Sequence, residues 1–103
     1  MGTDEKFELG QVVTTPKAVE QMASVDPDGN HRRVAAEMLC RHHKGDWGDV
    51  DNVDAQSNDI ALKTGARLMS LYNQGGHDFL VITEAEGADG VRPSTTVLLP
   101  EDY

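Results

Sequence analysis

Four oxygen-bearing side chains around residue 30 have the spacing of a calcium-binding loop. Ligands at loop positions one, three, five and twelve would come from Asp26, Asp28, Asn30 and Glu37. Such a loop needs glycine at its sixth position for a sharp bend, and His31 stands there instead. We therefore expect a polar turn in which Asn30 caps the next helix, with calcium binding at these four residues as the alternative.

A second group of residues could suggest zinc: Cys40, His42, His43 and His31. On a helix, positions 40 and 42 point about 200° apart, so their side chains cannot face one metal ion. We expect His42 to pack at the edge of the core. We expect Cys40 to be a buried, unreactive thiol, because it falls inside a predicted helix. No metal site and no cofactor are predicted here.

Sequence motifs for nucleophilic or phosphate chemistry are absent. No serine lies in a Gly-x-Ser-x-Gly elbow, and no glycine-rich loop is followed by a helix and a lysine. An acid–base site could still be assembled from residues far apart in the sequence, because active sites are defined by geometry. The prediction is a protein without enzymatic activity and without catalytic residues.

The segment 46–59 carries five aspartates and no lysine or arginine. One hypothesis is a binding face for a basic protein partner, and the alternative is a solvated helix face with capping carboxylates. Trp47 is either an exposed contact residue or an anchor of its loop in the core, and we expect the anchor. We also expect Asp46 to bind backbone N–H groups of its own loop. The candidate partner-binding residues are Asp46, Trp47, Asp49, Asp51, Asp54 and Asp59.

The charge balance limits the kinds of partner. Eighteen acidic residues oppose nine basic ones, giving a formal net charge of −9, which disfavours direct binding to nucleic acid. No apolar run approaches the roughly 20 residues of a membrane-spanning helix. The first residues contain no apolar stretch behind a basic one, so we predict no secretory signal. A single cysteine excludes an internal disulfide framework. These features predict a cytoplasmic protein that does not bind membranes.

The hydrophobic pattern changes from helical to alternating after Gly65, which gives the fold class. Helices are predicted over residues 16–25, 31–43 and 52–64, and strands over 7–13, 67–72, 77–83 and 94–99. Short turns between the last three strands favour an antiparallel meander. We predict a single α+β domain over residues 1–103, with a three- or four-stranded antiparallel sheet and about three helices on one face.

The periodicity also predicts which side chains face the interior. In the helix over 52–64, the inward stripe is expected to contain Val53, Ser57, Ile60, Ala61 and Thr64. The predicted core of the domain includes Val19, Met22, Leu39, Ile60, Leu68, Leu80, Ile82, Val97 and Leu99.

Five strings of the sequence are similar to a known protein family: FELG at 7–10, RHHKGDWG at 41–48, GARLMSLY at 65–72, ITEA at 82–85 and TTVLLPEDY at 95–103. Together they resemble small bacterial plasmid-related proteins, which occur largely on plasmids and integrated mobile elements. Members are often labelled type I restriction endonuclease subunit M. This chain lacks the Asn-Pro-Pro-Tyr-like catalytic motif and the large cofactor-binding sheet of a methyltransferase. The resemblance therefore implies a genomic setting and no catalytic residues.

The residues and the resemblance together lead to one functional hypothesis and one alternative. The hypothesis is a non-enzymatic, protein-binding accessory protein of a plasmid or mobile element. The alternative is an acidic anti-restriction or anti-CRISPR inhibitor. Its carboxylates would imitate phosphates and occupy the DNA-binding groove of a defence enzyme.

Overall fold

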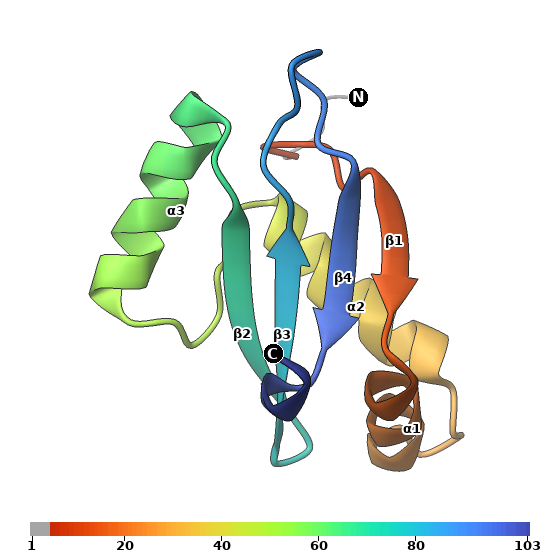
Figure 1. Ribbon diagram of the computed structural model, residues 1–103. Helices are drawn as coiled ribbons and strands as arrows, with labels where there is room; N and C mark the ends of the chain where they lie inside the picture. The colour runs from red at the N-terminus through yellow and green to blue at the C-terminus, as the bar shows by residue number, and fades with distance from the viewer. Residues whose placement is uncertain (1–4) are drawn as a thin grey trace.

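The computed structural model describes residues 5–103, which form one small domain of α+β class, as predicted (Figure 1). The elements are β1 (Gln11–Thr14), α1 (Pro16–Val25), α2 (His31–His43), α3 (Asn52–Thr64), β2 (Leu68–Gln74), β3 (His77–Thr83) and β4 (Ser94–Leu98). A short 3-10 turn, η1 (Pro100–Asp102), follows β4. The start of the chain, from which we predict the absence of a secretory signal, lies partly outside the described residues.

The four strands form one mixed sheet in the order β1-β4-β3-β2. The predicted meander is confirmed, since β2 pairs antiparallel with β3 and β3 pairs antiparallel with β4. β1 instead runs parallel to β4, with Gln11 beside Ser94 and Thr14 beside Val97. Three helices separate β1 from β2 in the sequence, so no tight turn sets the direction of β1. Parallel pairing becomes possible through such a long connection.

β1 is shorter than the predicted strand over 7–13. Gly10 adopts a left-handed backbone with φ 66°, and a Cβ at this position would lie 2.5 Å from the Arg92 carbonyl oxygen. Only glycine suits both the conformation and the close approach, so the strand begins after it. The preceding residues leave the sheet, and Phe7 packs against the rings of His42 and Trp47.

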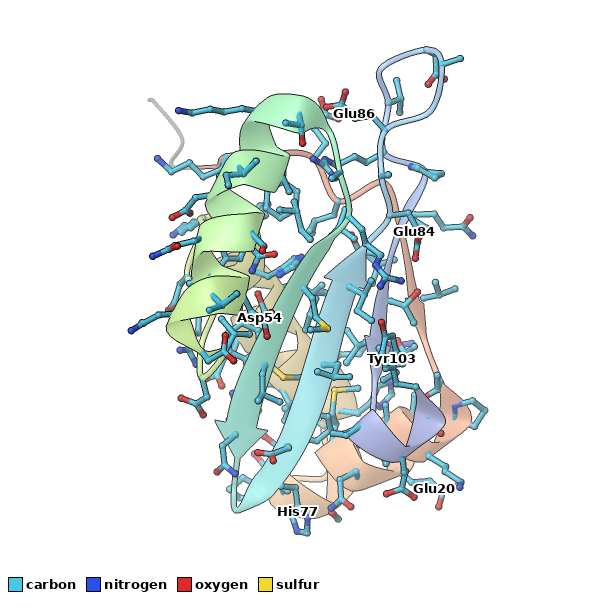
Figure 2. All side chains as sticks on the ribbon, turned by 60° about the vertical axis from the view of Figure 1, so that its left-hand side comes forward. Glu20, Asp54, His77, Glu84, Glu86 and Tyr103 are labelled. Carbon is cyan, nitrogen blue, oxygen red and sulfur yellow. The ribbon has the colours of Figure 1, made fainter. Side chains whose placement is uncertain are left out.

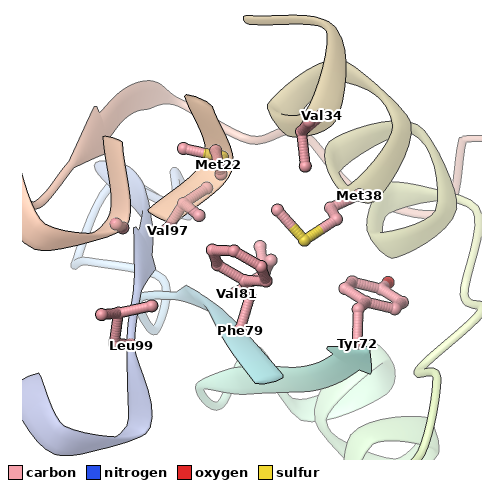
Figure 3. Close-up of a cluster of buried hydrophobic side chains, with 9 residues drawn as sticks. Met22, Val34, Met38, Tyr72, Phe79, Val81, Val97 and Leu99 are labelled. Atoms are coloured by element: carbon pink, nitrogen blue, oxygen red, sulfur yellow. The ribbon is translucent and has the colours of Figure 1, made fainter. Parts of the chain in front are cut away.

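The main core lies between the sheet and the two helices α1 and α2 (Figure 3). Alternate residues of the strands, among them Tyr72, Phe79 and Val81, meet Met22 of α1 and Met38 of α2. Six predicted core residues are buried: Met22, Leu68, Leu80, Ile82, Val97 and Leu99. Val19 and Leu39 are only partly buried.

The opposite face of the sheet is also apolar. Leu80, Ile82 and Leu98 form a buried cluster there with Met69 and Leu71 beside them. The turn η1 and Tyr103 lie on this face of the sheet (Figure 2). The hydroxyl oxygen of Tyr103 accepts a hydrogen bond from Arg67 Nη2 at 2.8 Å, which links the end of the chain to the start of β2.

α3 lies beside β2, at the edge of the sheet rather than over its face (Figure 1). The predicted inward stripe is wrong for this helix: Val53 is 71% exposed and Ile60 is 61% exposed, and Ser57 and Thr64 are exposed as well. Ala61 is buried as predicted, and Asn58 is buried with it. The Asn58 amide donates to the Met69 carbonyl oxygen at 2.7 Å and accepts from the Met69 N–H at 3.1 Å.

The physical reason for this orientation is the position of α3 against a strand edge. An edge strand presents N–H and C=O groups that need partners, whereas a sheet face presents apolar side chains. The helix therefore turns a side-chain amide inward and leaves Val53 and Ile60 outside.

We predict that truncating Leu68 and Ile60 will affect stability very differently, although the sequence pattern places both in the core. Leu68→Ala should lower the free energy of unfolding by about 2–5 kcal/mol, because Leu68 is fully buried. Ile60→Ala should change it by less than about 0.5 kcal/mol. Urea denaturation monitored by circular dichroism measures both. A large loss for Ile60→Ala would contradict the exposed position of this side chain.

Candidate functional site

The loop between α2 and α3 is held by Asp46. One carboxylate oxygen accepts from Arg41 Nε at 2.8 Å, and the other accepts from Arg41 Nη2 at 3.3 Å and from the backbone N–H of Gly48 at 3.1 Å. The hydrogen bond from Arg41 lowers the pKa of Asp46, so the carboxylate stays charged. The prediction that Asp46 binds its own loop is confirmed. Its charge is balanced within the protein.

Trp47 anchors the same loop in the interior, as predicted. It is only 7% exposed, its ring stacks on Phe7 with centroids 6.2 Å apart, and the edge of His42 lies at 5.8 Å. The indole Nε1 donates to Asp59 Oδ1 of α3 at 3.1 Å. Trp47 is therefore a structural link between the loop and α3, and the carboxylate of Asp59 is used internally.

Three of the candidate carboxylates lie at the start of α3, at Asp49, Asp51 and Asp54. Asp51 caps the helix by accepting from the Asp54 N–H at 2.8 Å, and the backbone N–H of Asp49 donates to Leu71. Within residues 5–103, Asp49, Asp51 and Asp54 form no ion pair. They gather near the N-terminal end of α3, where carboxylates also suit the helix dipole (Figure 2 labels Asp54).

The outward side of α3 is an apolar ridge and not a continuous acidic face. Val53 and Ile60 are seven residues apart and therefore lie on the same side of the helix, with Gln56 and Ser57 between them. Asp54 and Asp59 are five residues apart, which places them roughly 140° from one another around the helix axis. The structure places Asp49, Asp51 and Asp54 near the N-terminal end of this ridge. Asp46, Trp47 and Asp59 instead form the contacts that hold the loop.

The four residues of the calcium alternative use their oxygens differently. One carboxylate oxygen of Asp26 accepts from the backbone N–H groups of Asp28 and Asn30, both at 2.9 Å, and these bonds lower the pKa of Asp26. The Asn30 side chain caps α2 by accepting from the Arg32 N–H. Arg33 lies 3.6 Å from Asp26 and 3.3 Å from Asp28. Glu37 is exposed on α2. The segment is thus a polar turn and helix cap, and its carboxylates already face a cation.

The side chains considered for zinc point in different directions. α2 buries Val34, Met38 and His42, which are four residues apart and share one side of the helix. Cys40 lies two residues beyond Met38 and is exposed, so the expectation of a buried thiol is wrong. Within the part of the chain that the structure describes, no group of three or more His, Cys, Asp or Glu residues could hold a metal ion.

The sequence analysis missed a buried chain of hydrogen bonds centred on His42. Its Nδ1 lies 2.6 Å from Ser70 Oγ of β2, and its Nε2 lies 2.8 Å from Thr83 Oγ1 of β3. Thr83 Oγ1 lies 2.7 Å from Thr95 Oγ1 of β4, which donates to the Leu9 carbonyl oxygen at 2.7 Å. The sequence feature that could have revealed these hydrogen bonds is a serine or threonine at an inward-facing position in each of β2, β3 and β4.

The carbonyl oxygen of Leu9 determines the direction of the bonds between Leu9 and His42. A carbonyl oxygen only accepts, so the proton of Thr95 is used at Leu9, and Thr83 must donate to Thr95. Thr83 then accepts from His42, so Nε2 carries a proton. Burial, with smaller contributions from the charges of His43 and Arg92, lowers the pKa of His42 from 6.5 to about 3. At neutral pH the ring is therefore neutral, Nδ1 carries no proton, and Nδ1 accepts from Ser70.

Arg92 is a second buried group that the sequence did not reveal. It is 5% exposed and donates to three carbonyl oxygens, those of Ala66 (2.7 Å), Glu84 (3.1 Å) and Ala61 (3.1 Å). Ala61 lies in the last turns of α3, where a cation suits the negative end of the helix dipole. Arg92 therefore ties the β3–β4 loop to α3.

A cleft of about 300 Å³ lies beside Arg92. Basic and acidic side chains alternate around it, together with apolar ones: Lys6, Phe7, Glu8, Leu62, Glu86, Val91 and Arg92. The donors of Arg92 already bind backbone carbonyls, and the two glutamates balance the two cations. The hydrogen bonds of Arg92 therefore hold the wall of this cleft in place.

Comparison with protein-family models finds no match for this chain, and comparisons with curated proteins and with solved structures find no match either. Within residues 5–103, no helix combines the length and the apolar character needed to cross a membrane.

We predict that His42 makes stability depend on pH in the mildly acidic range. Its pKa is about 3 in the folded protein and near 6.5 when unfolded, so the unfolded chain binds the extra proton. The stabilisation is complete above pH 6.5 and is lost as the pH falls towards 3. The slope approaches about 1.4 kcal/mol per pH unit. Urea denaturation between pH 6.5 and 5, where most carboxylates remain charged, measures it.

The matched controls are His42→Gln and His77→Gln. Glutamine at position 42 keeps one donor and one acceptor but does not titrate, so the slope should become shallower. His77 is exposed at the start of β3, and its replacement should leave the slope unchanged. Equal slopes for the wild type and His42→Gln would contradict the assignment to His42.

Proposed function

We propose that this protein is a non-enzymatic, protein-binding accessory module that acts in the cytoplasm and belongs to a plasmid or mobile element. Its partner face is the outward ridge of α3, formed by Val53 and Ile60, together with Asp49, Asp51 and Asp54 at one end. The observation that carries this proposal is the exposure of two large apolar side chains, 71% and 61%, on the outer side of one helix. The genomic setting comes from the resemblance to plasmid-related proteins.

Apolar and acidic groups give this face two complementary properties. Burying a valine or isoleucine side chain at an interface contributes about 1.5–3 kcal/mol, which makes the ridge an attachment point. The three carboxylates form no ion pair within 4 Å among the described residues, so they attract a basic protein and make association sensitive to salt. The partner with the best fit presents an apolar groove with lysine or arginine at its rim.

The alternative function, an acidic inhibitor that occupies the DNA-binding groove of a restriction or CRISPR enzyme, uses the same three carboxylates. Its support is the net charge of −9 and the nearness in sequence of Asp49, Asp51 and Asp54, which form no ion pair within residues 5–103. In this alternative the carboxylates contribute more to the binding free energy than the apolar ridge does. The two functions therefore differ in which substitutions abolish binding.

We predict that a partner captured from a lysate of the producing cell will be lost when the ridge is changed. The protein serves as immobilised bait at low and high salt, and mass spectrometry identifies what it retains. Val53→Ser with Ile60→Ser should abolish retention at either salt concentration. Replacing Asp49, Asp51 and Asp54 by asparagine should weaken retention at low salt, and asparagine preserves the helix cap at position 51.

The control is a triple variant with the same change of charge elsewhere: Glu20→Gln, Glu37→Gln and Glu84→Gln. It should retain the partner as the wild type does. Recovery of a nuclease or Cas subunit, lost in the asparagine variant and kept in the serine variant, would favour the inhibitor. Retention unaffected by either set of changes would show that α3 is not the partner face. Turnover of a substrate by the purified protein would overturn both functions.

A further inference from the structure

The two edges of the sheet differ in how their backbone groups are satisfied. β2 is one edge, and the outward-facing peptide groups of Met69 and Leu71 are capped. The Asn58 amide binds both the N–H and the C=O of Met69. The N–H of Leu71 donates to the Trp47 carbonyl oxygen, and its C=O accepts from Asp49. This edge is closed to another strand at these two residues.

β1 is the opposite edge, and no other strand among residues 5–103 pairs with its outer side. The N–H groups of Gln11 and Thr15 donate to carbonyl oxygens beside and within β4, so these alternate residues face the sheet. The peptide groups of Val12 and Thr14 therefore point away from it. Val12 and Val13 are 42% and 44% exposed, one on each side of the strand. Figure 1 shows no element on the outer side of β1 along these residues.

β1 is short, at four residues, but it lacks the other features that keep an exposed edge from pairing. These are a charge, a proline or a bulge within the strand. The strand reads Gln-Val-Val-Thr, pairs with β4 in unbroken register, and lies in a charge-free run from Leu9 to Pro16. In a chain with net charge −9, an uncharged and β-branched edge is suited to a strand with the same properties.

We propose that β1 pairs antiparallel with β1 of a second copy of this chain, across a two-fold axis at Val13. Because the strand carries no charge, pairing it with itself brings no like charges face to face. Residues with outward peptide groups pair with each other, and the left-handed backbone of Gly10 keeps this residue out of the ladder, so Val12 lies opposite Thr14 of the second copy and Val13 lies opposite Val13. The result is a continuous eight-stranded sheet.

The capped edge at β2 limits this assembly to two copies. A two-fold contact uses the same surface on both copies, and it therefore closes on itself. Further growth would need a free strand at the outer end, where Asn58 and the loop of Trp47 and Asp49 already occupy the backbone groups. This interface lies on the opposite edge of the sheet from α3, so the proposal does not depend on the function proposed above.

The register is tested with cysteine variants in a Cys40→Ser background. Cα atoms of a directly opposed, non-hydrogen-bonded antiparallel pair lie about 4.5 Å apart, inside the roughly 4.4–6.8 Å range of disulfides. Val13→Cys should therefore form a disulfide-linked dimer under mild oxidation, seen on a non-reducing gel. Val12→Cys is the matched control, being equally exposed and adjacent. Its counterpart in the second copy lies diagonally, about 7–8 Å away, so linkage should be lost.

The unlinked protein provides the second measurement. Sedimentation equilibrium should show a mass rising from the 11.2 kDa of one chain to twice that value as concentration increases. Salt should strengthen the dimer, because it screens the repulsion between two chains of charge −9. Val12→Lys should abolish it, with an unchanged circular dichroism spectrum showing that the fold is kept.

Three results would overturn the proposal. They are a monomer at every concentration and salt, equal cross-linking of Val12→Cys and Val13→Cys, or a Val12→Lys variant that still dimerises. A monomer would leave the edge open to a strand of a different protein, which is a different conclusion from the one proposed. Masses beyond twice that of the chain would contradict the closed two-fold arrangement.

Discussion

The arrangement of this fold depends on the buried hydrogen bonds of His42. One imidazole contacts a hydroxyl on β2 and a hydroxyl on β3, and the second hydroxyl continues through Thr95 to the segment before β1. Each polar group must keep its partner, because an unsatisfied buried donor or acceptor costs about 1–3 kcal/mol. Hydrophobic contacts alone would tolerate small shifts of α2 across the sheet, whereas these bonds allow one position.

The fixed position of α2 also determines where the proposed partner face on α3 lies. α2 ends one residue after His42, so its end also determines where the following loop begins. Trp47 packs against the edge of His42 and donates to Asp59, and this bond joins the loop to α3. Asn58, on the neighbouring position of α3, binds the edge of β2. The orientation of α3 thus follows from a series of polar contacts that begins at a buried histidine.

Local signals in the sequence predicted the positions of most helices and strands. They did not predict how all of these elements pair and pack with one another. Thr15, Asn30 and Asp51 act as caps, and Gly65 ends α3 with a left-handed backbone, so the helices were predicted closely. The meander followed from its short turns. The direction of β1 did not, because its partner β4 is about eighty residues away in the sequence. Cys40 is exposed because Met38 and His42 point inward and Cys40 lies about 200° around the helix from each of them. The prediction of a buried thiol relied on the position of Cys40 within a helix and not on the side of the helix it occupies.

Asn58 illustrates why the candidate site was only partly predictable. Hydrophobic periodicity assumes that the apolar side of a helix faces the protein, and this holds for a helix that covers a sheet face. α3 covers a strand edge, where backbone N–H and C=O groups need hydrogen-bond partners. The side-chain amide of Asn58 binds both the N–H and the C=O of Met69.

Turning Asn58 inward necessarily turns Val53 and Ile60 outward, because these residues lie on the other side of the same helix. The same amide binds the peptide groups of Met69 and closes the β2 edge of the sheet there. The exposed ridge of α3 and the closed edge at β2 therefore have a common origin in the orientation of one side chain.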